Sequence, residues 1–232
     1  MTSADPAAFC SLFPGLSELA ELYRELDREI ARFKRAVALD CPEFCRTCCT
    51  AAEEQIEVSV FECLPLSLHL WGRGEGESCL QRIAANGGNN LCVLYTPRDS
   101  LLPDWGCAHY AWRPLLCRLF GFSSVLDKHG RPRIALCRAI KEEDPQAESR
   151  VNEKIAGGLE PVIIRHWAEK ASSLNPHLGR RRHPINQALR LALEKVGFQT
   201  HLLQAEGGEK QGPDQEEFKE NPAEDRFYRG QR

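Results

Sequence analysis

The run C-P-E-F-C-R-T-C-C occupies residues 41–49 and holds four cysteines. A second group of four, Cys92, Cys107, Cys117 and Cys137, runs through G-C-A-H-Y-A-W-R-P-L-L-C-R-L-F-G-F. Thiolates are the usual protein ligands for zinc and for iron–sulfur clusters. Eight clustered thiols exceed what packing requires, so the sequence predicts a metal centre. The predicted ligands are Cys41, Cys45, Cys48, Cys49, Cys92, Cys107, Cys117 and Cys137.

The adjacent pair Cys48 and Cys49 bears on the kind of centre. Neighbouring side chains point apart, by about 180° in a strand or 100° in a helix. Either one of the two is a packing thiol, or the pair divides between two nearby centres. A multinuclear cluster offers more attachment points than one ion. The pattern therefore favours an iron–sulfur cluster, with [4Fe-4S] expected, and leaves Zn²⁺ as the alternative cofactor.

Composition limits the class of protein. The chain has 232 residues, 42% of them hydrophobic, and a net charge of -3, so no global field selects nucleic acid or an acidic membrane. No apolar stretch approaches the roughly 20 residues that a membrane span needs, and no signal peptide is visible. We therefore expect a cytoplasmic protein with no membrane partner. In a reducing compartment, clustered cysteines favour metal binding over disulfides.

Hydrophobic spacing predicts a mainly helical protein. Residues Leu16, Leu19, Tyr23, Leu26, Ile30, Phe33 and Val37 recur in steps of three and four, which indicates an amphipathic helix. We expect it to pack on the core; a coiled-coil seam with a second chain is the alternative. Ser59 and Glu62 form a capping-box pattern that begins another helix, which Pro65 should kink or shorten.

A β-hairpin is predicted from two apolar runs, 120–126 and 132–136, around Asp127-Lys128-His129-Gly130. Closing it should bring Cys117 and Cys137 near each other.

Later helices should begin at Asp144-Pro145, Pro161 and Pro184, the last ending at Gly197. From about Ala205 the composition predicts a disordered tail.

The predicted fold is mainly α with a small β-hairpin, an irregular cysteine-rich, metal-centred core and a helical C-terminal extension. The expected divisions are 1–40 for the N-terminal helix, 41–140 for the metal-binding domain, 141–204 for the helical extension and 205–232 for the tail.

Charged side chains near the cysteines suggest supporting roles. Arg113 and Arg118 flank Cys117, and guanidinium groups close to anionic sulfur would stabilise a negative cluster. The alternative is that both pair with surface carboxylates. The basic run 179–183 is interpreted as a solvated loop, so nucleic-acid binding is not favoured. Cys10, Cys63 and Cys79 are interpreted as buried packing thiols.

The chain resembles the CxxCxxCC putative zinc- or iron-chelating domain family. The resemblance covers roughly residues 41–140: the run C-P-E-F-C-R-T-C-C, then the element at Cys92, then Cys107-x-x-Tyr110-x-x-Arg113-Pro114-x-x-Cys117-Arg118. Three residues rather than two separate Cys41 from Cys45, which departs from the family pattern. The resemblance implies a bound metal, often iron–sulfur. The flagellin lysine-N-methylases carry a similar cysteine arrangement.

Three functional hypotheses follow. The first is an iron–sulfur or iron protein that acts in redox chemistry, metal handling or modification of a partner. The second is a structural-zinc module that binds a protein partner through its helices. The third is a cluster-dependent protein-modifying enzyme resembling the methylases. The sequence shows neither a G-x-G-x-x-G motif nor a P-loop, and it identifies no catalytic residue.

Overall fold

The computed structural model describes residues 12–41, 47–50, 55–86, 91–96 and 106–207. The chain divides into two compact units, Met1–Gly197 and Phe198–Arg232. The first is mainly helical, and its strands within these ranges pair into two-stranded antiparallel sheets. This confirms the predicted mainly α fold class. None of the helices in these ranges has the length and apolarity that crossing a bilayer requires.

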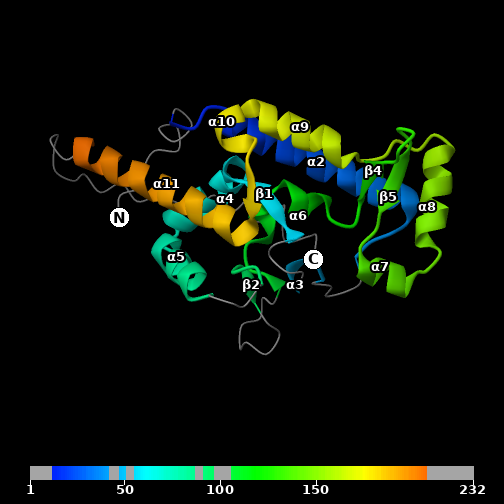
Figure 1. Ribbon diagram of the computed structural model, residues 1–232, viewed down its shortest axis with the longest axis horizontal. Coiled ribbons are helices and arrows are strands. Elements are labelled where there is room, and N and C mark those ends of the chain that lie inside the picture. The colour runs from blue at the N-terminus through cyan, green and yellow to red at the C-terminus, as the bar shows by residue number, and fades with distance from the viewer. Residues whose placement is uncertain (1–11, 42–46, 51–54, 87–90, 97–105, 208–232) are drawn as a thin grey trace, which may run out of the picture. The chain divides into compact units, whose positions relative to one another are not determined.

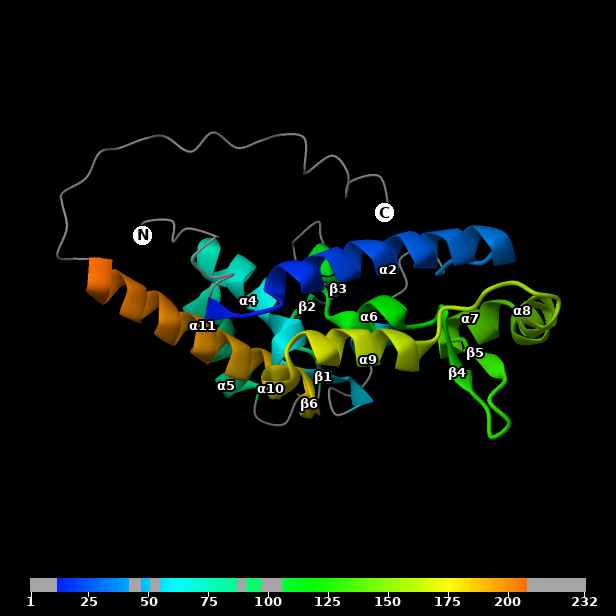
Figure 2. The same ribbon diagram turned by 90° about the horizontal axis from the view of Figure 1, so that it is seen from above.

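Helix α2 (Leu16–Val37) confirms the amphipathic helix predicted from the spacing of its apolar residues. Leu19 and Leu26 are fully buried, whereas Glu and Arg side chains on the opposite face form exposed ion pairs. Helix α9 (Ile164–Leu174) lies alongside α2 in both views (Figures 1 and 2). The apolar stripe of α2 is thus covered by the chain's own core.

Helix α4 (Val60–Gly72) follows the short strand β1 (Glu57–Ser59) and begins at the predicted capping box. The Ser59 hydroxyl accepts a bond from the Glu62 amide, and the Glu62 carboxylate accepts one from the Ser59 amide, both at 3.2 Å. The helix continues through Pro65 to Gly72. Burial of the flanking leucines outweighs the hydrogen bond that proline removes. A second short helix, α5 (Gly76–Ala85), follows.

The predicted hairpin is confirmed as β4 (Ser123–Leu126) paired with β5 (Pro132–Ala135). Helix α6 (Leu115–Leu119) precedes it, and α7 (Arg138–Glu143) follows it. The predicted helix start at Asp144-Pro145 is displaced, because α8 runs over Ala147–Ala156. Asp144 caps the turn before α8, accepting a bond from the Gln146 amide at 3.2 Å.

The basic run before the last helix is only partly the solvated loop that the sequence suggested: Arg180 and Arg181 are exposed, whereas Arg182 and His183 belong to a strand. After α10 (Pro176–Gly179), strand β6 (Arg182–Pro184) pairs with β1, with Ser59 opposite Arg182. The Arg182 side chain donates to the Glu57 carbonyl at 3.0 Å and lies 3.5 Å from the Glu62 carboxylate. Part of the positive charge of the basic run, that of Arg182, is therefore paired within the fold.

Gly197 does not end the last helix, so that prediction is wrong. Helix α11 extends over Ile185–Gly207, and residues 208–232 of the predicted tail lie outside the described ranges. The glycine serves close packing instead: a Cβ at this position would lie 2.6 Å from Cζ2 of Trp71. The Trp71 indole donates to the Leu193 carbonyl at 3.0 Å, which fixes the ring against α11.

Candidate metal centre

Five short elements bring the two cysteine groups together. Helix α3 (Thr47–Thr50) carries Cys48 and Cys49. Strand β2 (Tyr95–Thr96) pairs with β3 (Gly106–Cys107), which places Cys107 opposite Tyr95. The 3₁₀ turn η2 (Tyr110–Trp112) then leads into α6, which carries Cys117. Long-range pairing rather than chain proximity therefore assembles the site.

Five of the predicted ligands line one small cavity of about 30 Å³. The rest of its wall is mostly apolar, and only Arg113 brings a charge of fixed sign. The cysteines are Cys48, Cys49, Cys92, Cys107 and Cys117, and the other lining residues are Ile56, Leu94, Tyr110, Arg113, Pro114 and Ile185. Ile56, Leu94 and Ile185 are buried, whereas Tyr110 is 57% exposed. The cavity thus has an apolar floor and one wall that reaches solvent.

Three of these thiols form a chain of contacts. The Cys48 and Cys49 sulfurs are 3.9 Å apart, and Cys49 also hydrogen-bonds Cys107. The bond with Cys49 lowers the pKa of Cys48 to about 6 and that of Cys107 to about 7. The pKa of Cys49 is raised, because its proton is shared with Cys107 and Cys48. Both adjacent cysteines face the same cavity, contrary to the expectation that their side chains diverge.

The second part of the cavity holds Cys92, which is buried, and Cys117, which is partly buried. Burial raises the pKa of Cys117, and the neighbouring Cys92 raises it further. Cys63, in α4, is also buried, and its pKa is raised by burial, with repulsion from Cys92 and Cys117 adding to it. Its burial confirms the interpretation of Cys63 as a packing thiol, which its place in an apolar helical run had indicated.

Of the remaining predicted ligands, Cys41 and Cys137 are not among the residues that line the cavity. Cys41 is exposed just after α2, and Cys45 lies outside the described residues. Cys137 is the N-cap residue of α7 and packs near Gly121, so it is not among the residues that line the cavity. Cys117 sits on a helix rather than at the entry to the strand. Closing the hairpin therefore does not place Cys117 and Cys137 side by side at the cavity.

The two arginines that flank Cys117 differ in position. Arg113 lines the cavity, stacks on the Tyr110 ring at 3.4 Å and donates to the Cys117 carbonyl at 3.2 Å. Arg118 is buried and turned toward α2, where it pairs with Asp27. Arg113 occupies the place expected of a group that offsets sulfur charge. Arg118 instead holds α6 against α2.

A group of aromatic and acidic side chains adjoins the cavity. His69 stacks on Trp112 with ring centroids 4.5 Å apart, and His109 lies 3.5 Å from the Glu75 carboxylate. Desolvation lowers the pKa of His69 to about 4 and lowers that of His109. The His109 amide also bonds the Cys107 sulfur. Among the described residues, no three His, Cys, Asp or Glu side chains are already arranged as the ligands of a metal ion.

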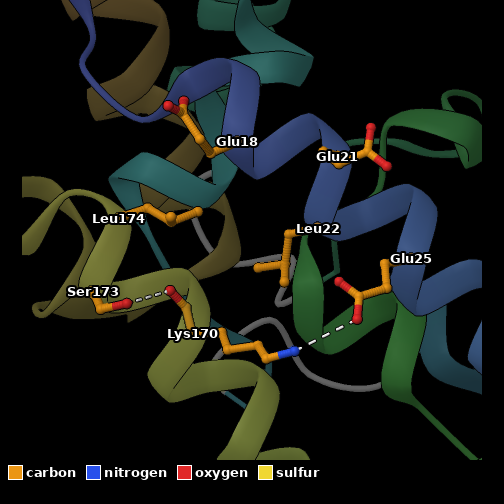
Figure 3. A pocket seen from close by; sticks show the side chains of 7 residues that line it. All are labelled: Glu18, Glu21, Leu22, Glu25, Lys170, Ser173 and Leu174. Carbon is orange, nitrogen blue, oxygen red and sulfur yellow. Dashed lines mark hydrogen bonds and ion pairs between the residues drawn. The ribbon is translucent and has the colours of Figure 1, made fainter.

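A second hollow on this unit differs in its lining from the cysteine cavity. It measures about 320 Å³ and lies between α2 and α9. Figure 3 shows Lys170 reaching toward Glu25, with which it pairs at 3.5 Å, while Glu18 and Glu21 point outward. These side chains form a surface groove of paired charges. It holds no thiol and no buried polar side chain.

Comparisons with known proteins identify no relative. No protein-family model, curated protein or solved structure matches the chain. The resemblance to the CxxCxxCC family remains a prediction from the cysteine motifs. What the site does is therefore argued from its residues alone.

Proposed function

We propose that the protein binds a thiolate-ligated metal centre in the cavity between α3, β3 and α6, with an iron–sulfur cluster as the favoured occupant. One observation carries this proposal. Five thiols from two segments far apart in the sequence, 48–49 and 92–117, line a single cavity whose floor is apolar. Packing alone gives no reason to gather five sulfurs at one point.

The chemistry of the donors fits such a centre. Several thiolates in one cavity repel each other, and a metal ion or cluster offsets that repulsion. Cys48, Cys49, Cys92, Cys107 and Cys117 would hold the group. A bound cluster would supply one-electron redox chemistry, at a potential set by charge, hydrogen bonds to sulfur and solvent exposure.

The surrounding residues have separate tasks. The guanidinium of Arg113 offsets negative charge on the sulfurs, and the His109 amide donates to Cys107. Ile56, Leu94 and Ile185 keep water from the buried side of the site. We infer a redox role, with metal handling and cluster-dependent modification of a protein partner as the other uses of the same centre.

A single zinc ion is the second candidate, and the size of the cavity favours it. A volume of about 30 Å³ accommodates one small ion more readily than a cluster of several atoms. A tetrahedral zinc site with Zn–S bonds of about 2.3 Å sets its sulfurs about 3.8 Å apart. The Cys48 and Cys49 sulfurs, at 3.9 Å, already match that spacing.

Metal analysis of protein purified and reconstituted without oxygen separates the two candidates. A cluster gives stoichiometric iron and sulfide with broad visible absorbance, and zinc gives a colourless protein with one ion bound. Cys117→Ser should lose most of the metal, whereas Cys79→Ser, a matched buried cysteine in α5, should retain it. Equal metal content in both variants and the wild type would contradict the proposal.

A further inference from the structure

Two neighbouring thiols lie in contact in the cysteine cavity. The sulfurs of Cys48 and Cys49 are 3.9 Å apart, and both side chains line the cavity. The two residues belong to α3, a helical segment of four residues, and neither is part of a disulfide. Because they are adjacent in the chain, bringing them together closes no long loop and costs little chain entropy. Local geometry thus holds two reduced sulfurs in contact.

We propose that this pair is a site of oxidative modification, at which a hydroperoxide joins Cys48 to Cys49 by a disulfide bond. One sulfur attacks the O–O bond of the hydroperoxide ROOH, which gives a sulfenic acid, Cys–SOH, and releases ROH. The second sulfur then displaces the hydroxyl of the sulfenic acid, and the S–S bond forms as water leaves. One thiol proton ends in ROH and the other in water. The two thiols together lose two electrons, and the hydroperoxide gains them.

The geometry of neighbouring residues predicts that this disulfide is easily reduced. The sulfurs must move from 3.9 Å apart to the bonded distance of about 2.0 Å. The Cα atoms of neighbouring residues are about 3.8 Å apart. Most disulfides join Cα atoms that are about 4.4–6.8 Å apart, so bridging this pair strains the ring. Strained disulfides have the potentials of labile, regulatory bonds rather than of structural ones, and the modification should therefore be reversible.

Position in the fold favours this pair over the thiols that pack in the core. Cys48 and Cys49 are partly buried, whereas Cys63 is 1% exposed and Cys79 is 0% exposed. Tyr110, which lines the same cavity, is 57% exposed, so one wall of the cavity meets solvent. The cavity of about 30 Å³ leaves room for a solute close to water in size. Hydrogen peroxide, the smallest hydroperoxide, is therefore the expected oxidant.

The consequence for a metal centre rests on the proposed function. A thiolate is the form of cysteine that binds a metal, and a disulfide sulfur carries no such charge. Oxidation therefore removes Cys48 and Cys49 from the five cavity sulfurs that would hold the metal. Reduced protein should bind metal, oxidised protein should bind less, and reduction should restore binding. The pair then acts as a redox switch on the centre.

Peptide mapping of the full-length, metal-free protein tests the modification. The protein is treated with hydrogen peroxide, its remaining thiols are alkylated in denaturant, and its tryptic peptides are sequenced by mass spectrometry. Cleavage after Arg46 and Arg73 leaves Cys48, Cys49 and Cys63 in one peptide. We expect this peptide to lose two hydrogen atoms, with Cys63 alkylated and the other two cysteines not. Treatment with dithiothreitol should restore alkylation of all three.

Disulfides to other thiols of the cavity would give different products. A bond from Cys49 to Cys107 or Cys117 would link its peptide to the one that spans residues 99–118. Cys48→Ser and Cys49→Ser should each abolish the expected product. Cys107→Ser should leave it unchanged, as should Cys79→Ser, which removes a buried thiol outside the cavity.

Three results would overturn the inference. They are a cross-linked pair of peptides as the main product, alkylation of all three cysteines in the 47–73 peptide after oxidation, and sulfinic acid at either sulfur without a disulfide.

Zinc uptake separates this inference from the proposed function. After the peroxide is removed, oxidised and reduced wild type are offered zinc without added reductant, and the oxidised protein should take up less. Equal uptake by a protein that carries the disulfide would contradict the switch. Absence of the disulfide leaves metal binding by the reduced protein untouched. A protein that forms the disulfide but binds neither iron nor zinc when reduced retains the modification site and loses the proposed function.

Discussion

The polar groups on the two faces of helix α6 have different kinds of partner. On the face toward α2, the Arg118 guanidinium pairs with Asp27 and donates to the carbonyls of Arg113 and Ala111. On the face toward the cavity, Cys117 lies among other free thiols. There Cys49 is hydrogen-bonded to Cys48 and to Cys107. On the first face, the charge of Arg118 is balanced by a protein carboxylate. On the second face, the neighbouring groups are thiols.

Under the proposed function, this difference assigns stability to one region and metal binding to the other. Substitutions in the helical framework should lower the free energy of unfolding whether or not metal is present. Substitutions in the cavity should lower metal content while leaving the metal-free fold nearly as stable as before.

Arg118→Met should cause the largest loss of stability. The side chain is 5% exposed, and removing it leaves Asp27 and two carbonyls without their donor. Breaking a buried ion pair costs about 3–5 kcal/mol. Urea denaturation of metal-free protein measures the change. Arg150→Met, which removes an exposed ion pair with Asp144, serves as the control and should leave the midpoint within error. A similar midpoint for both variants would contradict a structural role for Arg118.

Gly197→Ala should destabilise the protein although alanine is the better helix former. The new Cβ would lie 2.6 Å from Cζ2 of Trp71, whose indole is held by its bond to the Leu193 carbonyl. Overpacking of this kind costs about 1–3 kcal/mol, against a helix-propensity gain of about 1 kcal/mol. Gly72→Ala, with nothing within 4 Å of its Cβ, is the matched control and should be neutral or stabilising. A stabilising Gly197→Ala would show that α11 is free to move away from Trp71.

The sequence predicted the regular parts of this framework because local patterns determine them. The apolar period of α2, the Ser59–Glu62 capping box and the β4–β5 hairpin were all visible in the chain. Gly197 was misread because a glycine at a helix end and a glycine under a tryptophan look alike in sequence. Trp71 is 126 residues away, and only the tertiary structure brings it there.

Five of the eight cysteines predicted as ligands line one cavity, and the motif spacing did not indicate which five. Motif spacing indicated the residue types, whereas the tertiary fold decides which sulfurs face one cavity. Cys48 and Cys49 both do, although adjacency alone suggested divergence. Cys137 is not among the lining residues and is instead the N-cap residue of α7, which follows the hairpin. Arg118 looked equivalent to Arg113, and its pairing with Asp27 on α2 was not predictable from neighbouring residues.

Ser59→Ala should have a moderate effect. It removes the side-chain cap of α4, together with the hydroxyl that donates to the Glu62 carboxylate at 2.9 Å. Loss of an N-cap serine costs about 1 kcal/mol. Thermal unfolding followed by circular dichroism measures it. Ser59→Asp retains a capping oxygen but sets a second carboxylate beside Glu62, so it should recover little of the loss. Full recovery would show that the cap, rather than the bond to Glu62, carries the effect.

Glu62 should give the fold a pH dependence. Burial raises the pKa of this carboxyl, while Arg182 and the bonds from Ser59 partly oppose the shift. A raised folded pKa contributes stability that is fully present below the unfolded pKa of about 4.3 and is lost as pH rises through the folded pKa. Glu62→Gln keeps the capping geometry and removes the titration. The wild type should therefore lose stability relative to the variant as pH rises across that window, and a difference in unfolding free energy that stays constant with pH would contradict the assignment.

Cys49→Ala should have the smallest effect on the metal-free protein, although Cys49 is the centre of the thiol network. Its side chain is only half-buried, and the contacts it loses are weak bonds to two other thiols. We expect a change below about 1 kcal/mol, as for substitutions that neither open a core cavity nor strand a charge. Leu119→Ala, on the buried side of the adjoining α6, should cost about 2–5 kcal/mol in the same assay. Metal content should follow the opposite order, with Cys49→Ala losing most of it and folded Leu119→Ala retaining it. If Cys49→Ala instead destabilises the metal-free chain as much as Leu119→Ala, the thiols belong to the framework, and the division between the two faces of α6 does not hold.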